Sequence, residues 1–354
     1  MSDSPALPAA GARAPEVLRR SGSASTRSAR PVLRRPRPAL RPDLRPVLLG
    51  VLALVAVACY LLLFVRGSFA FALERRATAV GAMVVAAFAQ GVATVVFQTV
   101  TRNRVLTPSI MGFDSLYVLA QTALVVVFGG SVLAATDGLP KLVVQTLVMV
   151  AFATLLFRWL FSGRWGDLHV LLLVGVTLGL AFDSLSVFLQ RVLSPTDHDV
   201  LSVRLFGRLT AVDPATLPLA VLVCAGAGVV VWRRRHRLDV LQLGRDTATG
   251  LGLDHRRELT VALVAVSVLV ASSTALVGPM TFFGFLVAAL ARQLAGTHRH
   301  AVLLPTAFAL GVLTLVGGQF VLEHIFYASG MLTVVVEFTG GLLFIALLLR
   351  KRSL

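Results

Sequence analysis

The amino-acid sequence predicts an all-α fold, a polytopic bundle of about ten transmembrane helices with both termini in the cytoplasm. Of the 354 residues, 56% are hydrophobic and 14% are charged, which is far more apolar than a soluble domain. Apolar stretches long enough for a helix to cross a bilayer recur between short polar breaks. The uneven distribution of Lys and Arg among those breaks indicates the orientation.

The first 45 residues differ in composition from the rest. They hold ten of the 33 Lys and Arg residues, amid Pro, Ser and Ala without apolar periodicity. Such a segment cannot bury a core, so residues 1–45 are expected to form a disordered basic cytoplasmic tail and residues 46–354 one transmembrane domain. No aromatic residue stands between these arginines to stack on a base, which argues against a nucleic-acid partner and favours anionic membrane lipid.

Windows of helical length give ten predicted spans, of which the eighth is short and contains Gly284. Dropping that span would put the terminal Arg350, Lys351 and Arg352 outside, against the positive-inside rule. The predicted spans are 47–65, 78–100, 114–134, 141–161, 168–189, 215–232, 259–277, 281–295, 301–321 and 332–349.

Several chemistries are excluded or disfavoured by composition. Cys59 and Cys224 both lie within apolar spans, so neither a disulfide framework nor a cysteine metal site is expected. The two lysines, Lys141 and Lys351, do not follow a glycine, so no P-loop can bind ATP. We expect no catalytic residue, no metal and no cofactor bound by this chain, and any ATP and Mg²⁺ would act on a partner.

The stretch "NRVLTPSIMGFDSLY", residues 103–117, interrupts two apolar runs. It is expected to form a cytoplasmic turn between the second and third spans, with Arg102 and Arg104 at the inner face. Pro108 cannot continue a helix, Gly112 permits a tight backbone and Asp114 can cap the following helix.

The cytoplasmic segment 233–258 contains "LDVLQLGRDTATGLGL", which predicts a short amphipathic helix, a glycine hinge and a second turn. Exposed Leu and Ala on such an inner elbow suit docking into the groove of a partner. The alternative is an amphipathic helix that lies on the membrane surface.

Other interruptions fall within the apolar spans. Gly278 and Pro279 lie where the seventh span must end, and Gly284 lies inside the eighth, as in broken helices that line a transport path. Asp183 and Glu337 stand in apolar sequence, where a mid-bilayer charge costs about 2.5–3.5 kcal/mol on insertion scales. They either line a pathway or form hydrogen bonds between helices.

Together these stretches resemble the permease family of bacterial iron-siderophore and cobalamin ATP-binding-cassette (ABC) importers, the FecCD type. The resemblance runs from about residue 70 to the C-terminus and is closer to the ferric-siderophore subgroup. It rests on "FQTVTRNRVLTPSIMGFDSLYVLAQT", "LGRDTATGLGL", "GPMTFFGFLVAALAR" and the region that begins "GGQFVLEHIFYASGMLTVVVEFTGG".

The resemblance implies ten helices per subunit, a multi-pass location in the cytoplasmic membrane and a second permease subunit, either a relative or a copy. It also implies two ATPase subunits beneath and an extracytoplasmic siderophore-binding lipoprotein. The ATPase would contact Leu243, Gly244, Arg245, Asp246, Ala248, Leu251 and Gly252. With the interruptions above, the pathway or gate would comprise Gln98, Pro108, Gly112, Asp183, Gly278, Pro279, Gly284 and Glu337.

The chain departs from the family pattern at both docking surfaces. Arg76 stands where the first outer arginine for the binding protein would fall, but the second is Ala79, so that contact depends on Arg75. After the coupling Leu-Gly, Arg245 replaces a common acidic residue and Asp246 follows.

Two functions are therefore weighed. The first is an importer permease without catalytic activity of its own, driven by a separate ATPase. The second is an ion-gradient-driven secondary transporter in which Asp183 or Glu337 relays protons. A secondary transporter would need inverted repeats, and the sequence has no convincing internal repeat.

Overall fold

The computed structural model describes residues 44–64, 68–130, 138–162, 168–205, 209–327 and 332–351, and these residues form helices and connections without a strand. The chain divides into a first unit, Met1–Ala39, and a second, Leu40–Leu354. The expected tail lies outside the described residues except for Leu44 and Arg45, which begin the first helix.

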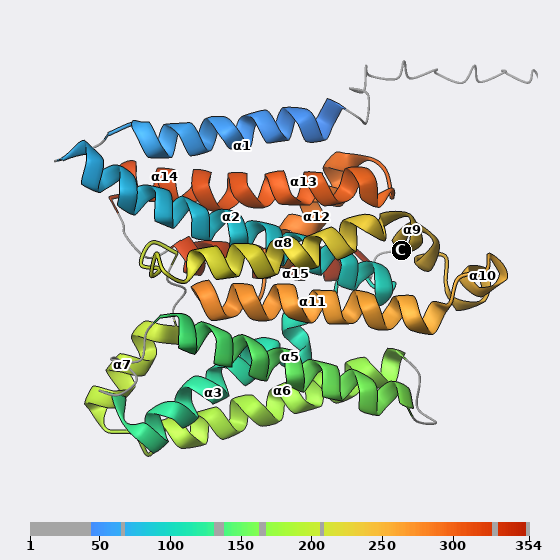
Figure 1. Cartoon of the computed structure of the whole chain (residues 1–354), viewed down its shortest axis with the longest axis horizontal. Coiled ribbons are helices and arrows are strands. Elements are labelled where there is room, and N and C mark those ends of the chain that lie inside the picture. The colour runs from blue at the N-terminus through green and yellow to red at the C-terminus, as the bar shows by residue number, and fades with distance from the viewer. Residues whose placement is uncertain are drawn as a thin grey trace, which may run out of the picture. The chain divides into compact units, whose positions relative to one another are not determined.

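The predicted all-α class is confirmed, and each of the ten predicted windows coincides with a helix (Figure 1). The windows correspond in order to α1 (Leu44–Leu62), α2 (Phe69–Val100), α3 (Phe113–Phe128), α5 (Leu139–Ser162), α6 (Leu168–Gln190), α8 (Leu217–Arg233), α11 (His255–Val277), α12 (Phe283–Ala295), the run of α13 (His300–Val312), η2 (Leu313–Gly317) and α14 (Gly318–His324), and α15 (Leu332–Lys351). Between them lie η1 (Pro108–Met111), α7 (Pro195–Leu205), α9 (Arg235–Leu241) and α10 (Arg245–Gly250).

Among the described residues, five helices are long and apolar enough to cross a bilayer, or six if the bent pair α8 and α9 counts as one span. Shorter apolar helices occur in α3, α5, α12 and α15. The count of ten spans and the position of both termini remain predictions.

Helix α2 forms the centre of the bundle and packs against α11, α13, α12 and α8. Its most apolar window is 83% buried, and many of its buried residues are Ala, Val or Gly. Small residues let backbones approach closely inside a bilayer. A Cβ on Gly311 of α13, for example, would lie 3.1 Å from the carbonyl oxygen of Ala87 in α2.

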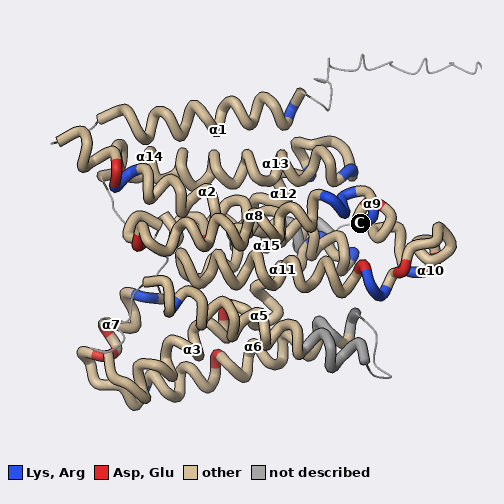
Figure 2. The backbone as a smooth tube through the Cα atoms, viewed as in Figure 1, with Lys and Arg blue, Asp and Glu red and all other residues tan. Residues whose placement is uncertain are grey.

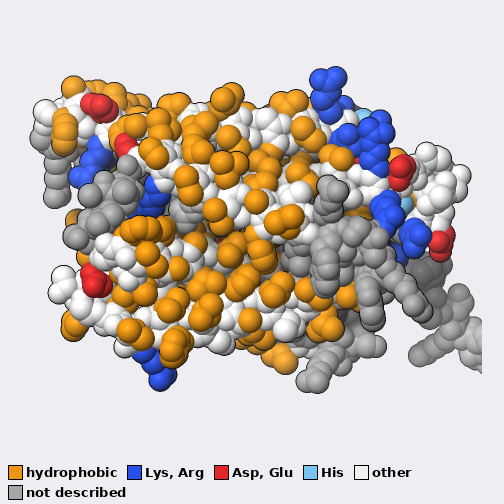
Figure 3. All heavy atoms as spheres, turned by 60° about the horizontal axis from the view of Figure 1, so that its bottom comes forward, with side chains coloured by type: hydrophobic (Ala, Val, Ile, Leu, Met, Phe, Trp, Pro, Cys, Tyr) orange, Lys and Arg blue, Asp and Glu red, His pale blue; other side chains and the backbone are white. Residues whose placement is uncertain are grey.

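The outside of the bundle matches a lipid environment. Figure 3 shows hydrophobic side chains over most of one face, with Lys and Arg gathered toward its ends. The backbone view of Figure 2 likewise places most charged residues near the ends of the helices. A broad apolar surface between two charged ends is the pattern of a membrane-embedded bundle.

Residues 101–112 and 278–282 interrupt the helices at the two ends of the bundle. Residues 102–104 are exposed, as the expected cytoplasmic turn requires, whereas residues 107–109 and 111–114 are buried. The expectation of a simple surface turn was therefore incomplete, because the second half of this segment enters the bundle and η1 packs against α6 and α11. Helix α12 has 13 residues, about 20 Å at 1.5 Å per residue, so it is too short to cross about 30 Å of hydrocarbon.

Candidate functional site

The two interrupted segments meet inside the bundle. The hydroxyl of Thr281 donates a 2.8 Å hydrogen bond to Oδ2 of Asp114. Asp114 was expected to cap α3, but the cap position belongs to Gly112, without a side-chain hydrogen bond. Oδ1 of Asp114 is buried and has no hydrogen-bond partner among the described residues. Asp114 therefore joins the start of α3 to the segment before α12, instead of capping its own helix.

Glu337 of α15 holds the start of α12. Its two carboxylate oxygens accept from the backbone N–H of Phe282 at 3.2 and 3.0 Å. Three residues along α15, a Cβ on Gly340 would lie 3.0 Å from the carbonyl oxygen of Phe282, so the helix backbone approaches this turn closely. A carboxylate at a helix N-terminus satisfies an otherwise unpaired donor and interacts favourably with the helix dipole.

Gly112 places the η1 segment directly on α6. Its φ of +89° is in the left-handed region, and a Cβ there would lie 3.0 Å from Cα of Gly179. One turn further along α6, Asp183 is exposed on the surface of the chain. The predicted pathway residues Pro108, Gly112 and Asp183 therefore lie on or against one helix, α6.

Gln98 and Gly284 lie instead along the interface of α2 with α12. A Cβ on Gly284 would collide with the hydroxyl of Thr94 in α2. Near the other end of α12, Arg292 donates to Oε1 of Gln98 from Nε at 3.2 Å and from Nη2 at 2.9 Å. Arg292 was not among the predicted site residues, although it is a cation inside an apolar window.

The elbow, which was predicted to be cytoplasmic, consists of α9, residues 242–244, α10 and residues 251–252. Gly244 has a φ of +103° and Gly252 one of +81°, both of which favour glycine. The side chains of Leu243 and Leu251 are 54% and 64% exposed, whereas that of Ala248 is fully buried. Leu243 and Leu251 thus form the apolar surface of the elbow, and Ala248 lies beneath it. Arg245 and Asp246 are exposed beside them.

Polar contacts connect this elbow to α13 and α11, and indirectly to α2. Oδ1 of Asp239 lies 2.6 Å from Nδ1 of His300 and accepts from its backbone N–H at 2.8 Å. The other ring nitrogen, Nε2, lies 2.8 Å from the hydroxyl of Thr99 in α2. Glu258 of α11 pairs with Arg234 and Arg237, each at 2.6 Å. These contacts connect the elbow to α13 and α11, and through His300 to α2.

The pKa of Asp239 reflects this environment. Partial burial raises the pKa of its carboxyl, but the hydrogen bonds and charge of His300 outweigh burial, so the pKa lies below its ordinary value.

The two predicted docking arginines differ in their surroundings. Arg76 donates to the carbonyl oxygens of Tyr60 at 2.9 Å and Leu63 at 2.7 Å, so it caps the end of α1. Arg75 is exposed. Of the pair, Arg75 has the more exposed position.

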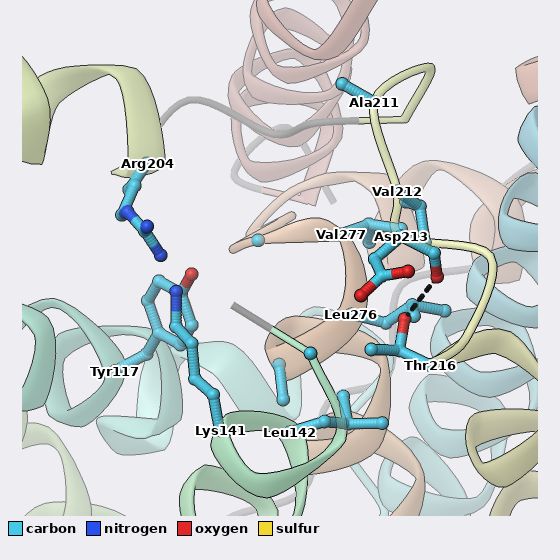
Figure 4. Close-up of a pocket in the computed structure, with 13 residues that line it drawn as sticks. Tyr117, Lys141, Leu142, Arg204, Ala211, Val212, Asp213, Thr216, Leu276 and Val277 are labelled. Atoms are coloured by element: carbon cyan, nitrogen blue, oxygen red, sulfur yellow. Dashed lines mark hydrogen bonds between the residues drawn. The ribbon is translucent and has the colours of Figure 1, made fainter. Parts of the chain in front are cut away.

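A cavity of about 110 Å³ lies where α3, α5, α7, the segment before α8 and the end of α11 converge near one end of the bundle. Figure 4 shows Lys141 beside Tyr117, with Arg204 directed toward them and Asp213 across the cavity. The sequence analysis did not predict this polar cavity, because its lining residues come from five separate segments. The only local signal was Lys141, one of the two lysines of the chain.

Comparisons with known proteins agree with these features. The sequence profile of the FecCD transport family matches residues 46–350. The petrobactin import system permease protein FatC of Bacillus anthracis is 39% identical over 315 residues, which cover 87% of this chain and 89% of the relative. The petrobactin import system permease protein YclO of Bacillus subtilis (strain 168) is 37% identical over 314 residues, which cover 89% of this chain and 99% of the relative.

A solved structure described as an inward-facing conformation of a metal-chelate type ABC transporter has a similar fold. Its TM-score is 0.74 at 18% identity, and the match covers 87% of this chain and 99% of that chain. This likeness concerns the fold alone.

Proposed function

The chain belongs to the FecCD transport family, and we propose that a pair of separate ATPase subunits drives it through its cytoplasmic elbow. It is a multi-pass membrane permease of an ABC importer for iron-siderophore chelates. As a permease it moves its cargo without chemical change, and ATP with Mg²⁺ acts on the partner ATPase.

The observation that carries the proposal is the construction of the elbow. Leu243 and Leu251 expose apolar surface on a segment that is anchored to α2, α11 and α13 by buried or partly buried polar contacts. An apolar patch on an anchored segment can receive a push from a partner and pass it to the bundle. The docking residues are Leu243, Gly244, Arg245, Asp246, Leu251 and Gly252, with Ala248 as internal support.

A second permease subunit would cover the faces of α6 and α15. Both helices expose large apolar side chains, among them Leu180, Phe188 and Phe338, and α6 also exposes Asp183. An intramembrane carboxylate is expected to face water or protein, not lipid. We therefore place the transport pathway along this side, with Asp183 lining it and the junction of Asp114, Thr281 and Glu337 behind it.

Two relatives named for petrobactin import support ferric petrobactin, or a chelate of similar structure, as the cargo. An extracytoplasmic binding lipoprotein would deliver it and contact the outer face at Arg75. The comparisons give no support to the alternative, a secondary transporter. One of its two candidate relay groups, Glu337, accepts a hydrogen bond from Phe282, which gives that carboxylate a structural role.

The test is uptake of radioactive iron in cells that express the complete transporter, with ferric petrobactin and a panel of other iron-loaded siderophores. Replacing the catalytic glutamate of the partner ATPase should abolish uptake, and dissipating the proton gradient at constant ATP should not. Uptake that persists without ATP hydrolysis would exclude the importer. Equal uptake of all chelates would exclude only the petrobactin assignment.

A further inference from the structure

An apolar groove lies on the outside of the bundle between α2, α8 and α13. It has a volume of about 320 Å³, and its lining comes from three helices: Phe88 and Val92 of α2, Ala225, Gly228, Val229, Val231 and Trp232 of α8, and Leu304, Pro305 and Phe308 of α13. The proposed dimer face on α6 and α15 does not contribute to it. In a chain that spans the membrane, this groove opens toward lipid.

The shape of the groove follows from its residues. Phe88 and Phe308 meet edge to face, with ring centroids 5.4 Å apart, and line its inner side. Gly228 has no side chain, and a Cβ there would collide with the ring of Phe88. Gly228 therefore lets the Phe88 ring pack directly against α8, and the small, exposed side chain of Ala225 leaves space along the same helix that a larger side chain would fill.

One end of the groove carries a partly exposed cation, Arg235. Trp232 is 43% exposed, and the guanidinium of Arg235 lies 4.7 Å from the centre of its ring. Arg235 also donates to the carbonyl oxygen of Trp232 at 3.0 Å. Its neighbours Arg234 and Arg237 are paired with Glu258, whereas Arg235 has no acidic partner among the described residues. A Trp with a neighbouring Arg is typical of the membrane–water interface.

We propose that this groove binds an anionic phospholipid, with one acyl chain along Ala225, Gly228 and Pro305 and the phosphate at Arg235. An acyl chain restores the van der Waals contacts that an unfilled apolar groove lacks. A headgroup with net negative charge complements Arg235. The inference rests on the membrane location of the chain and not on its cargo.

The position of this site has a consequence for coupling. Trp232 and Arg235 flank the 61° bend between α8 and α9, and α9 begins the elbow. Helix α9 also contacts α13, the opposite wall of the groove. A bound lipid would therefore contact both sides of the bend between α8 and α9 and stabilise it.

The test is native mass spectrometry of the full-length protein with phosphatidylglycerol or phosphatidylcholine of identical acyl chains. The wild type should retain phosphatidylglycerol at least several-fold better. Ala225→Trp, at an exposed lining position, should lose both lipids, and Leu222→Trp, on the same helix outside the groove, should not. Arg235→Gln should lose only the preference for phosphatidylglycerol over phosphatidylcholine. The control Arg257→Gln, which replaces an exposed arginine of α11, should keep that preference.

Equal retention of the two lipids by the wild type, or unchanged retention by Ala225→Trp, would overturn the proposal. Should Ala225→Trp fail to fold, Val229→Phe tests the same space, since Val229 lines the groove and is 55% exposed. The measurement is repeated on the assembled transporter. Loss of the lipid upon assembly would show that a partner helix, and not lipid, occupies the groove.

Discussion

Two carboxylates inside the bundle each accept a hydrogen bond from the short segment between α11 and α12. Asp114 accepts from the hydroxyl of Thr281, and Glu337 accepts from the backbone of Phe282. The sequence analysis left open whether Glu337 lines a pathway or joins two helices. The contact with Phe282 favours a joining role, while the exposed Asp183 keeps its assignment to the pathway as a proposal.

The role of Glu337 can be tested with two substitutions. Glu337→Gln retains a carbonyl oxygen that can accept from Phe282, so uptake should stay within about twofold of wild type. Glu337→Leu leaves that partly buried N–H unpaired, at a cost of about 1–3 kcal/mol, and should lower both the melting temperature in detergent and uptake. A Gln variant as inactive as the Leu variant would instead indicate that the carboxyl group itself is needed, as in a proton relay.

Asp239 gives a prediction with a defined pH dependence. In the folded state His300 lowers the pKa of Asp239 against the effect of burial. The contribution of Asp239 to the free energy of unfolding is therefore fully present above the ordinary Asp pKa of about 3.9. It is lost as the pH falls through the lower folded value. Asp239→Asn should therefore destabilise the protein by about 1 kcal/mol at pH 7, and the difference from wild type should vanish in strong acid.

The measurement is thermal unfolding of the purified protein in detergent as a function of pH. Asp246→Asn is a suitable control, because Asp246 is an exposed carboxylate on the same elbow. A difference that grows as the pH falls would contradict the assigned direction of the pKa.

At the scale of elements, the elbow combines an exposed surface with a buried interior. Leu243 and Leu251 face outward, Ala248 faces inward, and Arg102 lies against Gly244, with Nη1 2.9 Å from a Cβ built there. The short elbow therefore depends on neighbouring helices for its shape, since isolated helices of this length are unstable in water.

This arrangement separates docking from stability. Leu251→Glu should abolish co-purification of the ATPase and uptake without changing the melting temperature, because the side chain is 64% exposed. Leu251→Met keeps an apolar surface and should remain active. Ala248→Phe should lower both stability and uptake, since overpacking a buried site costs about 1–3 kcal/mol. A fully active Leu251→Glu variant would remove this residue from the docking surface.

At the scale of the whole molecule, the face of the bundle seen in Figure 3 is largely apolar, and most charged residues lie near the helix ends (Figure 2). The predicted topology places the elbow inside the cell and α7 outside. In that topology residues 101–112 enter the bundle from the inner side and residues 278–282 from the outer side. The hydrogen bond between Asp114 and Thr281 fits this arrangement, because it joins the two segments within the bundle.

The topology can be tested by cysteine labelling in intact cells. After Cys59 and Cys224 have been replaced, Thr196→Cys in α7 should react with a membrane-impermeant thiol reagent. Thr247→Cys in α10 should react only after the membrane has been opened. Both positions are exposed. Labelling of Thr247→Cys in intact cells would show that the orientation is the opposite of the predicted one, with the elbow out of reach of a cytoplasmic ATPase.

Apolar length and composition were enough to locate the apolar helices along the sequence, because they are local properties that a bilayer selects directly. Its motifs also located the elbow and the two interruptions. The hydrogen bond of Asp114 with Thr281, the contact of Glu337 with the start of α12 and the burial of Ala248 became visible only in the folded chain. These outcomes depend on the rotation and depth of helices relative to one another, which are set by packing between residues far apart in the chain.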